Sequence, residues 1–484
     1  MQIPRRLRIL DDALTSRVGV GLPLVLVFLL SLPAVTTRLY ASDEIQYFAY
    51  LRSLWFDHDV SFQNEYEYFY DRGIARARGF HETFLEFETP TGLRYNFGTI
   101  GSALLWAPFY AVGDLTARGM RLAGSGVAVD GFSQPYLSAL AYGSAVYGLL
   151  AIAISMVIVR RLLGSGPAAG FVIWIGTPLL FYTHIAPGMA HACSAFAVAL
   201  FTVVWLRVRR SWSLPGIAAL GAVTALMAMV REQDLLLAVG PAADFIWTAI
   251  ANVRTSSDRI KAARSWLIAA CVGSGVSALV YLPQAMSYIV LNGRIGPPDV
   301  LTEKMNWLAP HGLQVLFSPE HGLFVWTPLL LVAAGGLLWM AWSAGDGVAD
   351  RIDTRRIGLI LCLMVATQIY VTGSVDSWTA AGAFGQRRFV GLTVVWVVGL
   401  AAALQAIRST ALRRSAWAVC ALSVWWNLGL MVQFGANLMD RQRLQPSRNA
   451  YNTFVVVPRA APRLAYRYLF DRSSFYQTND SDAR

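Results

Sequence analysis

The sequence predicts an all-α polytopic membrane protein, a bundle of about 11 transmembrane helices. Of its 484 residues, 56% are hydrophobic and only 14% are charged, whereas soluble domains carry about 25% charged residues. Apolar stretches of bilayer-spanning length recur along the chain, and short arginine runs separate many of them. No internal repeat of fixed period interrupts this pattern. The chain is therefore expected to form one membrane domain with connecting loops.

The expected spans follow the apolar runs in order. They are 18–36, 134–158, 166–183, 188–206, 214–230, 234–252, 265–291, 322–343, 357–374, 389–407 and 414–436. The first run follows a basic start but lacks a clear small-residue cleavage site, so it is expected to stay as an uncleaved span. A further candidate, 97–115, is short, contains Pro108 and is bracketed by glycines. Its hydropathy alone does not decide whether it spans.

The arginine runs decide between the two topologies. If "RRLR" at 5–8 is cytoplasmic and 97–115 does not span, the arginine runs of the later short connections also fall in the cytoplasm, as the positive-inside rule requires. Segment 97–115 is then a re-entrant or juxtamembrane helix within a transmembrane domain over 1–436. The same topology exports the first loop 37–133, the loops 292–321 and 375–388, and the C-terminal tail 437–484.

Composition also excludes several function classes. The formal net charge of +11 is almost entirely arginine, but no basic stripe with interleaved aromatic residues marks a nucleic-acid surface. The four cysteines lie far apart, each within an apolar stretch, and no CxxC spacing occurs. Zinc-finger and thioredoxin-like sites therefore have no support.

An acidic pair, Asp43-Glu44, follows the first expected span by a few residues. Two solvated charges at a helix start would explain it, with Ser42 as N-cap and the acids favoured by the helix dipole. The next residues favour a functional reading, because an apolar and aromatic stripe predicts a helix lying in the membrane interface: Tyr47, Phe48, Leu51, Leu54 and Trp55. A carboxylate held there meets lipid headgroups and is suited to act as a general base.

At these residues the chain resembles the GT-C glycosyltransferases, in particular their bacterial protein-mannosyltransferase-like and RgtA/B/C/D-like branch. The resemblance rests on the outer acidic pair in "RLYASDEIQYFAYLRSLWFDHD" (38–59) and on three later segments. These are "NFGTIGSALLWAPFY" (96–110), "FSPEHGLFVWTPLLL" (317–331) and "GAFGQRRFVGLTVV" (382–395). It covers most of residues 18–436, and the WWDYG-type element of oligosaccharyltransferases is absent from the sequence.

The resemblance implies an enzyme of the bacterial inner membrane that works on the periplasmic or outer face. Such an enzyme takes a sugar from a polyprenyl-phosphate carrier and passes it to an envelope glycan, lipid or protein, in contact with membrane lipids. Carried onto this chain, Asp43 would be the general base or would position the acceptor. Glu44 would be its neighbour and a second catalytic carboxylate.

Four basic residues in later outer loops are candidates for binding the donor phosphate. Arg387 and Arg388 stand on the outer side, against the charge rule, either as headgroup anchors or as a clamp on the phosphate; the guanidinium fork suits the clamp. His321 and Lys304 are further candidates, although a lone histidine at a span start is more often a cap or interface residue.

Two other groups of polar residues favour structural readings. Asp57-His58-Asp59 offers metal-ligand chemistry, but three adjacent residues rarely converge on one ion, so no metal site is predicted. The resemblance leaves open a divalent cation as cofactor. The run Arg231-Glu232-Gln233-Asp234 is expected to form ion pairs at a turn between two spans, although ionisable groups within a membrane are also functional candidates.

The alternative to an enzyme is a lipid-linked-glycan flippase or transporter. Transporters often contain inverted repeats with ionisable residues near the bilayer midplane. This chain shows no such repeat, and many of its acidic residues fall in one large outer loop. The sequence therefore favours the transferase, without specifying the sugar or the acceptor.

Overall fold

The computed structural model describes residues 21–75, 79–164, 168–343, 351–380 and 382–472. Helices dominate this part of the chain, and its extended pairing is limited to two isolated bridges, Glu88–Arg94 and Met305–Val375. The expected all-α class is confirmed. The basic run at 5–8, the first residues of span 18–36 and the end of the tail lie outside the described residues.

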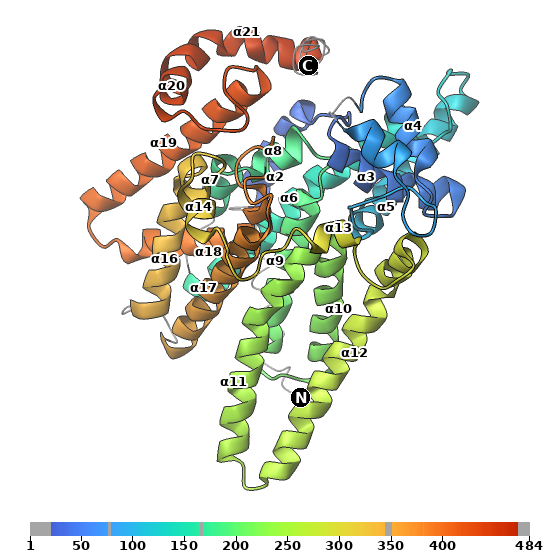
Figure 1. Ribbon diagram of the computed structural model, residues 1–484. Helices are drawn as coiled ribbons and strands as arrows, with labels where there is room; N and C mark the ends of the chain where they lie inside the picture. Colours follow the sequence, from blue (N-terminus) through green and yellow to red (C-terminus); the bar gives the residue numbers. More distant parts are fainter. Residues whose placement is uncertain (1–20, 76–78, 165–167, 344–350, 381, 473–484) are drawn as a thin grey trace.

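Long apolar helices form the body of the molecule (Figure 1). Among the described residues, seven helical segments are long and apolar enough to cross a membrane, and three shorter apolar helices accompany them. The chain is a multi-pass membrane protein, as predicted. The helices at these positions are α2 (Gly21–Ser31) with η2 (Leu32–Ala34), α6 (Gln134–Leu163), α9 (His191–Val208), α10 (Leu214–Val230), η5 (Glu232–Ala238) with α11 (Val239–Thr255), α12 (Arg259–Asn292), α16 (Leu329–Ser343), α17 (Arg351–Ser374), η6 (Arg387–Leu392) with α18 (Thr393–Ala406), and α19 (Thr410–Gly435).

Two expected spans are not continuous helices. Each breaks at a Thr-Pro step, Thr177-Pro178 in span 166–183 and Thr327-Pro328 in span 322–343. Proline donates no backbone hydrogen bond and disfavours helical backbone at the residue before it, which explains both breaks. The resulting pieces are α7 (Ala168–Gly176) and α8 (Leu179–His184) in the first case, and α15 (Leu323–Trp326) and α16 in the second.

The first loop folds into a compact layer at one end of the bundle, at the top of Figure 1, which we call the loop end. The apolar stripe after Asp43 was expected to lie in the membrane interface, and this prediction is wrong. Phe48 and Leu51 are buried by protein, and the Phe48 ring packs against Phe69 and Phe132. The loop is rich enough in aromatic residues to build its own core. Its helices are α3 (Ser42–Arg52), η3 (Ser53–Asp57), α4 (Gln63–Asp71), η4 (Glu82–Glu86) and α5 (Gly101–Leu122).

Helix α5 begins at Gly101, within the ambiguous segment 97–115, and runs antiparallel to the first half of α6. The hydroxyl of Tyr147 on α6 donates to the carbonyl of Leu105 at 2.7 Å. Farther along α5, Gly113 lies against Pro135 and Tyr136, at the start of α6. The end of α5 therefore runs past the beginning of α6. The non-spanning assignment of this segment stays a prediction.

The C-terminal tail folds back over the loop end (Figure 1). It consists of α20 (Pro446–Tyr451), η7 (Asn452–Val456) and α21 (Val457–Phe470). Before α20, the backbone N–H of Leu444 donates to the carbonyl of Pro319 at 2.9 Å, and the Gln442 side chain accepts from the N–H of Gly382 at 3.0 Å. The tail thus contacts both later loops.

Glycines allow α16 and α18 to pack closely. A Cβ atom added at Gly336 would collide with the carbonyl oxygen of Gly399, whereas one at the neighbouring Gly335 would meet nothing within 4 Å. Only glycine permits this backbone approach. The contact fixes α18, and α18 continues directly from η6, which carries Arg387 and Arg388.

Candidate active site

Asp43 and Arg387, 344 residues apart in sequence, meet at the loop end. The Arg387 guanidinium donates from Nη1 to Oδ2 of Asp43 at 2.7 Å. Asp43 lies in the first turn of α3, and Arg387 opens η6. The side chains are 38% and 23% exposed respectively, so the pair is accessible from outside. The structure therefore brings together the predicted base and one predicted phosphate ligand.

Glu44 faces the backbone that precedes α3. Its Oε2 accepts the N–H groups of Tyr40 and Ala41 at 3.0 and 3.1 Å, and the residue is fully buried. Ala41, and not Ser42 as expected, is the N-cap residue of α3, because Glu44 supplies the capping acceptor from inside the first turn. Burial raises the pKa of Glu44 to about 7. These contacts fix the start of α3 and so orient Asp43.

Arg388 joins η6 to the loop before it. It donates from Nη1 to the Ser377 carbonyl at 2.8 Å and from Nη2 to the Ser377 hydroxyl at 3.1 Å. It lies beside Arg387 and stays partly exposed. Two arginines adjacent in sequence are thus held at the start of η6, and a guanidinium group is suited to bind an anionic group.

His321 has a place in the packing of the loops. It is fully buried, its Nε2 lies 2.8 Å from the Ala383 carbonyl, and its ring stacks on Trp326. Burial lowers its pKa, so the ring is neutral at pH 7 and brings no positive charge to a phosphate. The histidine supports the loop before Arg387, and the phosphate role expected of His321 stays a prediction.

Lys304 is connected to the candidate site through backbone contacts. Its side chain is exposed, and its carbonyl accepts the N–H of Asp376 at 2.9 Å. This bond and the adjacent Met305–Val375 bridge join the loops 292–321 and 375–388. The phosphate role expected of the Lys304 ammonium group remains a prediction.

Arg231 is a cationic residue of the site that the sequence analysis did not assign to it. It lies in extended backbone between α10 and η5, and its buried Nη1 has no hydrogen-bond partner. Burial raises the pKa of Tyr47 to about 12, and the charges of Arg231 and Arg387 oppose that rise. Both guanidinium groups therefore act on the same tyrosine, one helical turn after Asp43. An arginine between two expected spans was the signal in the sequence.

Several polar atoms without hydrogen-bond partners belong to residues that are close to Arg231 in sequence or within range of its charge. Within the described chain, Gln233 Nε2, Asp234 Oδ1 and His191 Nδ1 are buried without hydrogen-bond partners. Ser194, one turn along α9 from His191, donates to the other oxygen of Asp234 at 2.6 Å. Buried polar atoms without partners are rare and call for a bound ligand or ordered water. Their gathering beside Arg231 marks this region as a place where a polar ligand would complete the hydrogen bonding.

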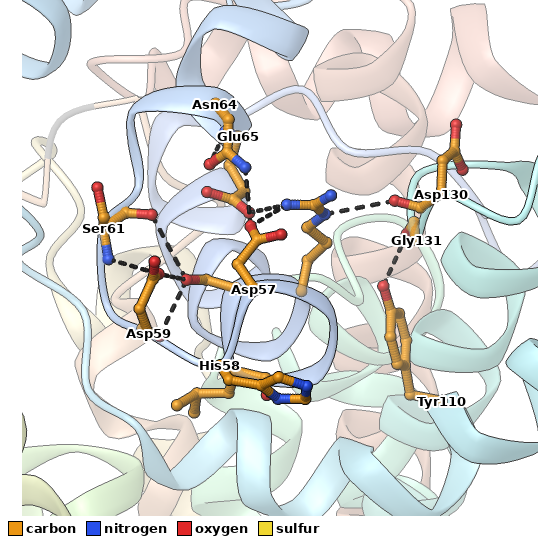
Figure 2. Close-up of polar contacts among 12 residues, drawn as sticks. Asp57, His58, Asp59, Ser61, Asn64, Glu65, Tyr110, Asp130 and Gly131 are labelled. Carbon is orange, nitrogen blue, oxygen red and sulfur yellow. Dashed lines mark hydrogen bonds and ion pairs between the residues drawn. The ribbon is translucent and has the colours of Figure 1, made fainter.

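The Asp57-His58-Asp59 run makes protein contacts in separate directions (Figure 2). Asp57 pairs with Arg52 and accepts from Asn64, while Asp59 accepts from the Ser53 hydroxyl and the Ser61 N–H. Across the described residues, no group of three or more His, Cys, Asp or Glu side chains could hold a metal ion. The run therefore braces the turn after η3.

Comparison with known proteins shows distant similarity at the level of structure. No family model and no curated protein matches the chain. Among solved structures, the chain is similar to ArnT from Cupriavidus metallidurans in the apo state, with 14% sequence identity and a TM-score of 0.48, over 95% of this chain and 79% of ArnT. At this level of identity and TM-score, function has to be argued from the residues of the site.

Proposed function

We propose that this protein is a GT-C-type membrane glycosyltransferase that moves a sugar from a polyprenyl-phosphate carrier to an envelope glycan, lipid or protein. The observation that carries the proposal is the accessible Asp43–Arg387 pair. It joins a carboxylate, which can accept a proton, to a cation, which can hold a phosphate, at one end of an apolar bundle.

In the proposed reaction, the acceptor hydroxyl attacks the anomeric carbon of the donor sugar. Asp43 takes the hydroxyl proton as the new carbon–oxygen bond forms. The bond between the anomeric carbon and the phosphate oxygen breaks, and its electron pair leaves with the polyprenyl phosphate. Arg387, Arg388 and Arg231 stabilise that phosphate by charge-assisted hydrogen bonds. Glu44 positions Asp43 by fixing the start of α3.

The Asp43–Arg387 pair also gives the site an order of events. In the structure, the arginine engages the carboxylate that is to act as base. A donor phosphate competes for the same guanidinium, and its arrival releases Asp43 to accept a proton. Base activation then follows donor binding.

The charge pattern supports an extracytoplasmic site. With the short arginine-rich connections placed in the cytoplasm, residues 37–133, 292–321 and 375–388 all lie outside. The first of these segments supplies Asp43, and the last supplies Arg387, Arg388 and the Ser377 carbonyl that Arg388 contacts. A polyprenyl carrier reaches such a site from the bilayer, and the acceptor reaches it from the envelope.

The proposal is tested by complementing a deletion strain and measuring envelope glycans and lipids by mass spectrometry. Wild type and Asp71→Asn, a change at an exposed aspartate of the same loop, are expected to restore the missing sugar. Asp43→Asn is expected to fail at equal abundance on immunoblots. Full restoration by Asp43→Asn would remove the catalytic assignment and favour the flippase alternative, which needs no base.

A further inference from the structure

Helix α21 carries three distinct stripes along its length. Val457, Ala461, Leu464 and Tyr468 follow helical spacing and face the protein. Arg459, Arg463 and Arg467 recur every fourth residue on a second stripe. The third stripe is apolar and exposed, and it comprises Pro458, Pro462, Ala465 and Leu469. The apolar stripe borders the arginine stripe on one side, and Tyr466 and Phe470 lie on that arginine side of the helix. Exposed apolar side chains beside arginines are typical of helices that lie in a membrane surface.

The end of α21 is fixed to the end of the first apolar helix. Tyr468 donates from its hydroxyl to the Ala34 carbonyl at 2.8 Å. Arg472 donates to the carbonyls of Val35 and Pro33, both at 2.7 Å. At these residues the apolar run of α2 and η2 gives way to polar sequence. The helix is thus held at the height where the chain leaves the bilayer.

The surface of α2 next to this contact faces lipid. Leu22, Leu26 and Leu30 are 55%, 49% and 81% exposed in a helix of a membrane protein, so acyl chains surround them. Figure 1 shows α21 lying crosswise to the long helices α11 and α12. The exposed face of α21 is therefore continuous with a lipid-facing surface and lies roughly along the plane of the membrane.

Three large side chains on α21 are not covered by the described part of the chain, and two of them, Tyr466 and Phe470, lie beside the arginine stripe. Tyr466 and Phe470 are 66% and 74% exposed, and Leu469 is 47% exposed. We propose that these three side chains insert into the bilayer surface and that Arg459 and Arg463 bind the phosphates of anionic phospholipids there. The occupant is the bilayer because the apolar stripe continues the lipid-facing surface of α2 and the arginines complement anionic headgroups.

This anchor has a consequence for the chain that leads to α3. Tyr468 and Arg472 hold residues 33–35, and Asp43 follows only eight residues after Val35. Insertion of α21 therefore steadies one end of this short connection. The lipid contact itself does not depend on the proposed transferase activity.

Insertion is tested with the full-length chain in nanodiscs that contain phosphatidylglycerol. The four cysteines, Cys193, Cys271, Cys362 and Cys420, are replaced by alanine, and a spin label is placed at Leu469→Cys or, as a control, at the exposed Glu67→Cys on α4. The label at 469 is expected to collide more often with oxygen than with a water-soluble nickel chelate, and the label at 67 the reverse. Equal nickel access at both positions, or protection at 469 only after soluble envelope proteins are added, would overturn insertion.

The arginine contacts are tested with the native cysteines in place. Native mass spectrometry across a phosphatidylglycerol titration measures apparent affinity for wild type and two double variants. The double variant Arg459→Gln with Arg463→Gln is expected to bind phosphatidylglycerol about tenfold or more weakly than wild type, because it removes two arginines from the membrane surface. The matched pair Arg443→Gln with Arg448→Gln lies in the same tail, exposed but outside α21, and is expected to stay near wild type. Equal affinities of the two double variants would refute the arginine site.

Discussion

Removing the Asp43–Arg387 pair should abolish most transfer while leaving the fold intact. The pair joins Arg387 Nη1 to Asp43 Oδ2 at 2.7 Å, with side chains 23% and 38% exposed. Partly exposed ion pairs contribute about 1 kcal/mol or less to stability. A general base contributes about 10²–10⁴ in rate, and a preorganised donor to developing charge about 10²–10³. Activity and stability are therefore expected to respond on very different scales.

The experiment compares Asp43→Asn, Arg387→Gln and the double variant. Each single variant should lower the initial transfer rate by about 10² or more. The double variant should lose much less than the product of the two losses, because the groups act as a unit. The rate is measured in membranes of the deletion strain with the donor that complementation identifies, and thermal unfolding is measured in detergent.

A matched ion pair on α5 provides the control. Arg118 Nε lies 2.9 Å from Asp114 Oδ2, and Arg118 is 56% exposed. Arg118→Gln removes the same kind of charge and should leave transfer near wild type. The reasoning is refuted if Arg387→Gln retains full transfer. It is also refuted if thermal unfolding shows that the variant loses transfer only because less of the protein is folded.

Three further predictions address the phosphate site, a buried acid and a helix crossing. Arg231→Gln should raise KM for the lipid-phosphate donor by about tenfold or more, because a charge-assisted hydrogen bond is worth about 1.5–3 kcal/mol; an unchanged KM in donor titrations would exclude Arg231 from the site. Glu44→Gln should flatten the pH dependence of stability. Burial raises the pKa of Glu44 from 4.5 to about 7, so the folded state keeps a proton on this carboxyl that the unfolded state has lost. The stability that this proton confers is fully present below about pH 4.5 and is lost as pH rises through about 7. Melting temperatures at pH 5.5 and 8 should therefore differ more in wild type than in the variant, and equal differences would contradict a buried, protonated acid. Gly336→Ala should lower stability by about 1–3 kcal/mol through overpacking against Gly399, while Gly335→Ala, with open space around its Cβ, should be neutral or stabilising by about 0.5–1 kcal/mol; equal melting temperatures for the two variants would rule out the collision.

The sequence alone determined the fold class and the order of the spans. Apolar runs of bilayer length have few alternatives to helix in a membrane, because backbone groups there must be satisfied within the segment. Each expected span therefore has helix at its position, and the Thr-Pro steps account for the two that are broken. The acidic pair Asp43-Glu44 and the arginines Arg387 and Arg388 were recognisable in the sequence because they are charged residues beside apolar runs.

Tertiary structure decided which of these residues meet. The sequence could not show that Asp43 pairs with Arg387, since 344 residues separate them and the packing of distant helices sets the contact. Nor could it show that Arg231 and Arg387 act on the same tyrosine, Tyr47. It also could not distinguish the roles of two adjacent acids. One residue of difference on a helix turns Glu44 inward onto backbone N–H groups and leaves Asp43 facing Arg387.

The environment of an apolar stripe was likewise a tertiary decision. Phe48 and Leu51 were expected at the membrane surface, but the first loop provides enough aromatic partners to bury them. Exposed apolar side chains occur instead on α21, where nothing else in the described chain covers Leu469, Tyr466 and Phe470. Periodicity fixes which residues share a face of a helix, whereas the neighbours that cover that face depend on how the whole chain packs.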